Sequence, residues 1–223
     1  MPESAGVIGE TIVTIPALAR LFLAVFAAFG LLATPASAAA PSPSDRAAVI
    51  HEIEAYFNAI DTLKCDFIQI APDGSLSQGR IYIKRPGFLR VEYDPPVKFL
   101  MVGDGRWINL IDYEVNDVSR WAISDTPLKI LVKSDLNLEK DVKIKSIDHA
   151  NGTIRLVVSS PDIPGQQSIT FLFAEAPLRL AQWEVTDGGG QTTRVALSNI
   201  ETGIKLDQKL FTFTDPRVKR GPR

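Results

Sequence analysis

Residues 79–93 read GRIYIKRPGFLRVEY, and this stretch decides the fold class. Apolar and polar residues alternate on both sides of the corner Lys84-Arg85-Pro86-Gly87, and a period of two places successive side chains on opposite faces of a β-sheet. Pro86 lacks an N–H group and disfavours helical backbone at the preceding residue, so the chain must turn there. The stretch predicts two strands whose apolar faces carry Ile81, Ile83, Leu89, Val91 and Tyr93.

Arg85 stands at the end of the first of these strands, beside an apolar face. Taken alone, an arginine at such a corner is most simply interpreted as a solvated turn residue. A functional role for Arg85 therefore depends on what the rest of the chain predicts.

Further strands are predicted wherever alternating apolar residues are bounded by turn residues such as Asp104-Gly105. The expected strands cover residues 63–70, 79–84, 88–93, 99–102, 107–113, 115–123, 142–148, 153–159, 168–173, 180–186, 193–200 and 210–214. About eleven short antiparallel strands predict a sheet that curls into an incomplete barrel. With the helices described next, the fold class is α+β.

Two segments predict helices. Residues 45–60 follow Ser44, a favourable N-cap, and their apolar residues recur at helical spacing. Residues 126–132 are strongly apolar and begin with Thr126-Pro127, a helix-entry signal. Two helices do not easily fill the concave face of so large a sheet to interior density. We therefore expect an apolar cavity covered by these helices, with a fully packed core as the alternative.

Residues 1–38 predict a secretory signal peptide. Arg20 precedes a run of thirteen uncharged, mostly apolar residues, and Ala36-Ser37-Ala38 forms a small-x-small cleavage site. The run is shorter than the ~20 residues needed to cross a bilayer, although an uncleaved anchor remains the alternative. Residues 39–44 are then a linker, residues 45–216 the folded domain and residues 217–223 a basic tail.

Charge and residue content argue against several function classes. The 223 residues carry a formal net charge of −2, so no nucleic-acid partner is expected. Cys65, the only cysteine, alternates with Phe67 and is interpreted as a buried structural residue. His51 and His149 are isolated, so we expect no metal and no cofactor. No nucleophile elbow, phosphate loop or paired-carboxylate motif occurs, so we expect no catalytic residues and no enzymatic activity.

Several features occur in an order that carries a resemblance. They are a signal peptide, an amphipathic helix, Thr62-Leu63-Lys64-Cys65-Asp66-Phe67-Ile68-Gln69, Lys84-Arg85-Pro86 after Gly79, Phe88 to Tyr93, Asp104-Gly105, the Thr126-Pro127 helix and Phe211-Thr212-Phe213-Thr214. In this order and at similar spacing, they resemble the outer-membrane lipoprotein carrier protein (LolA) family over residues 45–216.

The resemblance implies a lid of helices over an apolar cavity in an incomplete barrel. It implies a periplasmic, monomeric chaperone that takes acylated lipoproteins from an inner-membrane ABC transporter complex and carries them to the outer membrane, with or without an outer-membrane acceptor. At the matching positions, Arg85 would latch the closed lid through hydrogen bonds. The acyl-chain cavity would be formed by Phe57, Leu89, Val91, Tyr93, Leu128, Ile130 and Leu131.

Three questions stay open at this level. The basic residues of 217–223, where the family has prolines, a glycine and an apolar stub, are either solvated or contact anionic headgroups. Trp107, Trp121 and Trp183 either pack in the core or face the ligand. The alternative functions on the same fold are an envelope-stress sensor, for which a second domain would be expected, and a carrier of another lipid.

Overall fold

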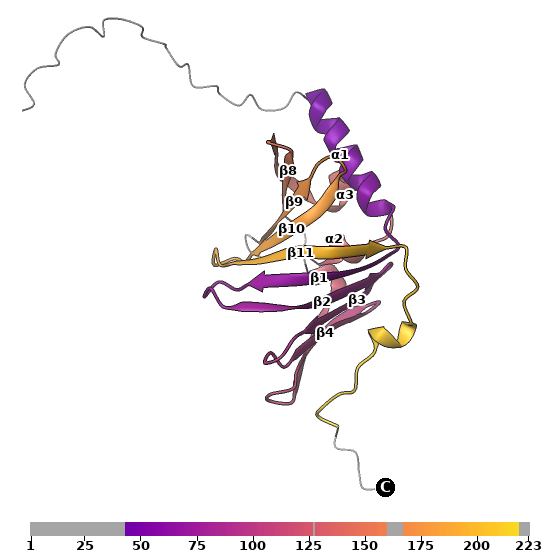
Figure 1. The fold of residues 1–223 in the computed structure, drawn as a ribbon, viewed down its shortest axis with the longest axis vertical. Helices are drawn as coiled ribbons and strands as arrows, with labels where there is room; N and C mark the ends of the chain where they lie inside the picture. The colour runs from indigo at the N-terminus through magenta and orange to yellow at the C-terminus, as the bar shows by residue number, and fades with distance from the viewer. Residues whose placement is uncertain (1–42, 127, 160–166, 219–223) are drawn as a thin grey trace, which may run out of the picture. The chain divides into compact units, whose positions relative to one another are not determined.

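The computed structural model describes residues 43–126, 128–159 and 167–218. Within them, eleven antiparallel strands form one sheet in the order β6-β5-β4-β3-β2-β1-β11-β10-β9-β8-β7 (Figure 1). The strands are β1 Thr62–Ile70, β2 Leu76–Lys84, β3 Phe88–Tyr93, β4 Phe99–Asp104, β5 Trp107–Asp112, β6 Asp117–Ala122, β7 Lys143–Ala150, β8 Thr153–Ser159, β9 Ser168–Ala174, β10 Arg179–Thr186 and β11 Thr192–Thr202.

The order of the strands explains why the barrel is incomplete. The chain starts in the middle of the sheet, runs outward through successive hairpins to β6, crosses to β7, and returns through hairpins to β11 beside β1. Among the described residues, β6 and β7 are the two edges and are not paired with each other. The crossing segment carries short helices instead of a strand, so this side of the curved sheet stays open. The predicted α+β incomplete barrel is therefore confirmed.

In the part of the chain that the structure describes, five helical segments of different lengths accompany the sheet. They are α1 Pro43–Asn58, η1 Ile123–Asp125, α2 Lys129–Val132, α3 Leu138–Asp141 and η2 Gln208–Phe211. The predicted N-terminal helix exists but begins at Pro43, not at Asp45, because N–H groups in the first turn have no helical partner and a proline is tolerated there. Of the predicted 126–132 helix, Lys129–Val132 forms α2 and residue 127 lies outside the described residues; α3 was not predicted.

The concave face of the sheet and the inward faces of α1, α2 and α3 share one hydrophobic core. Ile53, Phe171 and Phe173 are completely inaccessible to solvent. The ring of Phe57 packs edge-to-face on Phe171 and Phe173, with ring centroids 5.6 and 5.8 Å apart. Aromatic packing of this kind fixes the C-terminal half of α1 against β9.

The outer face of the sheet carries a second, smaller core. Leu100, Val102, Ile111 and Val118 are buried there beneath Phe213 of the C-terminal segment. The prediction of a strand at 210–214 is wrong: this segment begins as the 3-10 helix η2, for which the Asp207 carboxylate accepts the Lys209 N–H. The segment packs over β3 and β4, which are each already paired on both sides, so it lies across the outer face without joining the ladder.

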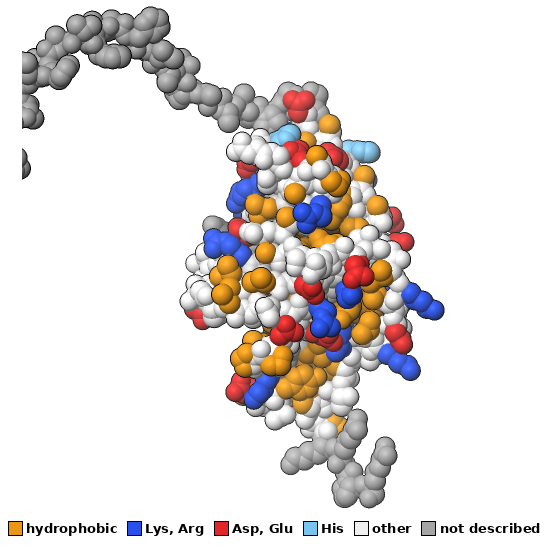
Figure 2. All heavy atoms as spheres, viewed as in Figure 1, with side chains coloured by type: hydrophobic (Ala, Val, Ile, Leu, Met, Phe, Trp, Pro, Cys, Tyr) orange, Lys and Arg blue, Asp and Glu red, His pale blue; other side chains and the backbone are white. Residues whose placement is uncertain are grey.

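Charged side chains occupy much of the remaining outer face. Figure 2 shows acidic and basic groups lying among hydrophobic ones on the face in view. Ion pairs join neighbouring strands there, including Lys64 Nζ to Glu201 Oε1 at 2.7 Å and Arg194 Nε to Glu184 Oε1 at 3.0 Å. Because water and salt screen such exposed pairs, they keep this face hydrated more than they stabilise the fold.

Some segments for which the sequence makes a prediction lie wholly or partly outside the described residues. The signal peptide 1–38 and residues 39–42 of the linker are outside, as are residues 219–223 of the basic tail. Arg217 is described, and it donates to Asp215 at 2.8 Å and to the Val118 carbonyl oxygen at 3.2 Å. No helix in the described part of the chain is long and apolar enough to cross a membrane.

Candidate functional site

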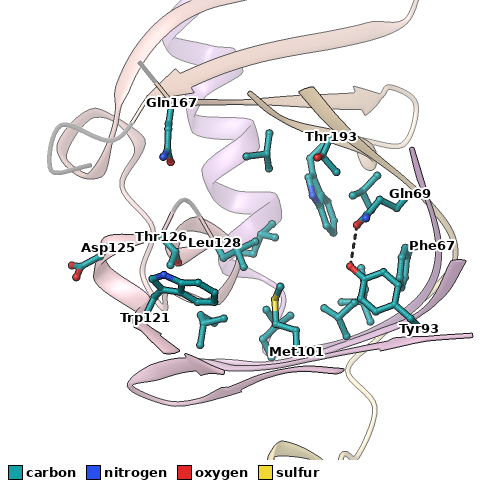
Figure 3. A pocket seen from close by; sticks show the side chains of 18 residues that line it. Phe67, Gln69, Tyr93, Met101, Trp121, Asp125, Thr126, Leu128, Gln167 and Thr193 are labelled. Carbon is teal, nitrogen blue, oxygen red and sulfur yellow. Dashed lines mark hydrogen bonds between the residues drawn. The ribbon is translucent and has the colours of Figure 1, made fainter. Parts of the chain in front are cut away.

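The concave face encloses an apolar cavity of about 440 Å³ (Figure 3). Alternate residues of each strand point into it, as the period of two requires. Both halves of the sheet, η1 and the approach to α2 contribute to the wall. The lining residues are Phe67, Gln69, Ile81, Leu89, Val91, Tyr93, Met101, Ile108, Trp121, Asp125, Thr126, Leu128, Leu131, Gln167, Trp183, Val185, Thr193 and Val195.

The structure brings together five of the seven residues that were predicted for the cavity: Leu89, Val91, Tyr93, Leu128 and Leu131. Phe57 lies instead against a separate void of about 20 Å³, together with Arg85. Ile130 is 3% exposed and belongs to the packed core beneath α2, not to the cavity wall.

The three tryptophans have different environments. Trp121 and Trp183 line the cavity, and the Trp121 side chain is labelled beside Asp125 and Thr126 in Figure 3. Trp107 does not line it, because its position in β5 points to the outer face. There the guanidinium groups of Arg106 and Arg120 stack at 5.5 and 5.8 Å from the Trp107 ring centroid.

Arg85 bridges the C-terminal ends of two helices. Its Nε donates to the carbonyl oxygen of Leu131 at 3.0 Å, and its Nη1 donates to that of Phe57 at 2.5 Å. These carbonyls belong to the last turns of α2 and α1, where C=O groups lack helical partners and the helix dipole favours a cation. Burial lowers the pKa of the Arg85 guanidinium and Asp61 opposes this effect, but an arginine remains charged. The solvated-turn interpretation of Arg85 does not fit this geometry.

The corner also holds α2 through its backbone. The Gly87 N–H donates to the Val132 carbonyl oxygen at 2.8 Å. Gly87 has φ +84°, a conformation that glycine adopts without steric cost. The lid helix α2 is thus held by two hydrogen bonds from one corner, and its buried face consists of Ile130, Leu131 and Val132.

The chain after α2 is fixed to α1 by separate contacts. The Asn58 carboxamide donates to the Leu136 carbonyl at 2.9 Å and accepts the Leu136 N–H at 2.8 Å. The Glu54 carboxylate accepts the Leu138 N–H at 2.6 Å, at the start of α3. The contacts that hold α2 and those that hold the start of α3 therefore use different residues.

The cavity also contains polar groups that sequence reasoning did not single out: Gln69, Asp125, Thr126, Gln167 and Thr193. The Tyr93 hydroxyl donates to Gln69 Oε1 at 3.1 Å across the wall. Burial raises the pKa of Tyr93, and the hydrogen bond with Gln69 only partly offsets this. Gln69 could have been assigned to the wall from its alternation with Cys65 and Phe67.

Other titratable residues have structural roles. Burial pushes the pKa of Asp104 upward, but hydrogen bonds from Trp107, Arg106 and Asn109, together with the charge of Arg120, hold that pKa below its usual range. The bonds from Trp107 and Arg106, at 2.8 and 3.1 Å, close the turn between β4 and β5. Cys65 is 1% exposed, and its burial raises the pKa of the thiol to about 12. In the described part of the chain, no three His, Cys, Asp or Glu residues are grouped as a metal site.

The fold and the cavity define this chain as an incomplete β-barrel with a hydrophobic cavity next to a short helix that is hydrogen-bonded to the sheet. The sequence model of the family described as outer membrane lipoprotein carrier protein LolA matches residues 58–214. The chain therefore belongs to the LolA family.

Individual relatives agree with this family. The outer-membrane lipoprotein carrier protein of Methylococcus capsulatus is 30% identical over 192 residues, covering 81% of this chain and 88% of the relative. That of Dechloromonas aromatica is 32% identical over 181 residues, covering 76% and 85%. Among solved structures, the LolA superfamily protein NE2245 from Nitrosomonas europaea aligns with a TM-score of 0.45 and 12% identity, covering 75% of this chain and 97% of that chain.

Proposed function

We propose that this protein is a periplasmic chaperone that holds the acyl chains of lipoproteins in the cavity and carries them from the inner to the outer membrane. It would receive them from an inner-membrane ABC transporter complex and release them to the outer membrane or to an acceptor there. The carrier function of its relatives supports this proposal. The observation that carries it is the 440 Å³ apolar cavity beneath α2.

The physics of acyl chains requires such a site. Each CH₂ group removed from water contributes about 0.8 kcal/mol, so a multiply acylated protein is insoluble unless its chains are covered. The cavity volume lies within the range of about 300–1,000 Å³ that is usual for ligand sites. Its wall is mainly aliphatic and aromatic, from Phe67 and Ile81 on one side to Trp183 and Val195 on the other.

Release requires that the closed state be easy to shift. Two hydrogen bonds from the corner, from Arg85 and Gly87, hold α2 over the cavity. A typical hydrogen bond contributes a net ~0.5–1.5 kcal/mol, or ~1.5–3 kcal/mol when one group is charged. A partner or a cargo that prefers the open state can therefore shift the equilibrium with modest binding energy. Arg85→Leu should bind cargo yet release it more slowly, because closing of the lid no longer drives unloading; normal transfer by this variant would refute the latch.

Purification from the native periplasm tests the proposed function. Mass spectrometry of the gently isolated protein should show acylated lipoproteins bound to it. Leu128→Asp, which places a charge on the cavity wall, should lose them, whereas Leu76→Asp at a 70% exposed position should keep them. A free lipid in place of lipoproteins would contradict the proposal and favour carriage of another lipid.

A further inference from the structure

Among the polar residues of the cavity wall, Gln69 carries a carboxamide that hydrocarbon chains cannot engage in hydrogen bonds. Gln69, in β1, lies on the same face as Cys65 and Phe67, and its carboxamide extends into the cavity beside Tyr93 (Figure 3). The Tyr93 hydroxyl donates to Gln69 Oε1 at 3.1 Å. Since the carbonyl oxygen is engaged, the Nε2 group is the free end, and it has no hydrogen-bond partner among the described residues. Gln69 is half-buried, so its N–H groups can be hydrated in the empty cavity and can donate to a ligand that displaces this water.

The absence of a side chain at Gly79 allows Tyr93 to reach Gln69. Phe67, Gly79 and Tyr93 lie in register across β1, β2 and β3, with Gly79 in the middle. A Cβ at Gly79 would stand 1.8 Å from the Glu92 carbonyl oxygen and 3.0 Å from the Phe67 ring. The bare backbone lets Tyr93 lean over β2, where its ring packs edge-to-face on Phe67 at 5.3 Å and its hydroxyl reaches Gln69. Tyr93 thus orients the carboxamide of Gln69.

The position of Gln69 gives the bound ligand a direction. Thr62 of β1 pairs with Lys84 beside the latch corner, whereas Gln69 lies seven residues further along the same strand. At about 3.3 Å per strand residue, Gln69 is roughly 20 Å from the corner. Tyr93 ends β3 and Thr193 stands near the start of β11, so the polar side chains of this region gather at the end of the sheet remote from Arg85.

We infer that Gln69, positioned by Tyr93, donates a hydrogen bond from Nε2 to an acyl carbonyl oxygen of the cargo, with the hydrocarbon tails directed toward the Arg85 corner. This inference rests on the proposed function, since it assigns the group that the same cavity recognises. It makes Gln69 a specificity residue for acyl esters over hydrocarbon chains of equal length, and Tyr93 a positioning residue.

Two synthetic probes test the inference on the full chain. Dioctanoylglycerol has two ester carbonyls, whereas the dioctyl glyceryl ether has the same chains without them. Tryptophan fluorescence titration should show about 3- to 10-fold tighter binding of the ester to the wild type, the value of one hydrogen bond. Gln69→Leu should remove this preference while ether binding stays within about twofold. Tyr93→Phe should reduce the preference only in part, because the amide remains but is no longer oriented.

Gln78→Leu is the matched control, since Gln78 is exposed on the outer face and donates to Asp94 at 3.3 Å. It should keep the wild-type ester preference, and thermal melts should confirm that all variants are folded. Equal binding of ester and ether to the wild type, or an unchanged preference in Gln69→Leu, would overturn the inference and leave the carrier function intact. Binding of neither probe would overturn the carrier function together with it.

Discussion

Arg85 and Leu131 lie 46 residues apart in the chain, yet a 3.0 Å hydrogen bond from the Arg85 Nε to the Leu131 carbonyl joins the corner of the sheet to the helix over the cavity. The same guanidinium lies 5.6 Å from the centroid of the Phe57 ring. It also donates a hydrogen bond to the backbone carbonyl oxygen of Phe57. One side chain thereby couples α1, α2 and the sheet. The proposed latch rests on this coupling.

Replacing Arg85 should release α2 without unfolding the protein. Arg85→Leu removes two charge-assisted hydrogen bonds, each worth about 1.5–3 kcal/mol, so hydrogen exchange in residues 129–133 should accelerate at least about tenfold. Amides of β9, which Arg85 does not contact, serve as internal references, and Arg85→Lys should give an intermediate rate because one ammonium cannot match the planar fork. Unchanged protection of α2 would show that apolar packing alone holds the lid.

A charge on the cavity wall should abolish binding of acyl ligands. Leu128 is half-buried and lines the cavity, so Leu128→Asp would place a carboxylate where the chains lie. Because an unpaired charge in an apolar site costs several kcal/mol, the affinity for dioctanoylglycerol should fall more than about tenfold. Leu76→Asp makes the same change at an exposed position and should bind normally. Equal affinity of the two variants would place the ligand elsewhere.

Gly79 should be intolerant of any side chain. The Cβ of an alanine would overlap the Glu92 carbonyl oxygen, so Gly79→Ala should lower the free energy of unfolding by about 2–4 kcal/mol in urea titrations. Gly189→Ala is the control, since its nearest neighbour would be the Asp187 carboxylate at 3.3 Å, on an exposed turn. A Gly79→Ala protein as stable as the Gly189→Ala protein would contradict the close approach of β2 and β3.

The stability of the protein should fall at alkaline pH through Cys65. Its folded pKa of about 12 lies above the value of about 8.5 for a free thiol. The stabilisation by the neutral buried thiol is therefore complete below pH ~8.5 and is lost as the pH rises toward 12. Between pH 8 and 10.5, the free energy of unfolding should decrease more in the wild type than in Cys65→Ala. Rapid alkylation of the native protein at pH 8 would contradict this burial.

The sequence predicted most of the sheet because the alternation of Ile81, Ile83, Leu89 and Val91 reflects burial on one face. It failed at residues 210–214, where Phe211 and Phe213 also alternate. Those rings face the outer side of a sheet whose central strands are already paired, so the same pattern arises without a ladder. Alternation reports which side chains are buried, and only the topology decides whether the backbone has a partner strand.

The cavity was predicted in kind but not in detail. The number of strands indicated that two helices would not fill the concave face. It did not indicate which residues would pack in the core and which would line the cavity. Phe57 and Ile130 are as apolar as Leu128, yet they lie in the packed part of the interior. Gln69 and Thr193 come together only because β1 and β11, the first and last strands, are neighbours. The α3 helix is four residues long and starts at the Asn137 cap, too short for a periodic signal.

Photocrosslinking would locate the acyl chains most directly. A diacylglycerol with a diazirine at the end of one acyl chain should, after irradiation of the full chain and peptide mapping, modify cavity residues such as Leu89, Met101 and Leu131. Excess dioctanoylglycerol should compete with it, and Leu128→Asp should suppress it. Adducts confined to outer-face residues such as Leu76 and Ile68, unaffected by the competitor, would contradict the proposal that the cavity is the site of transport.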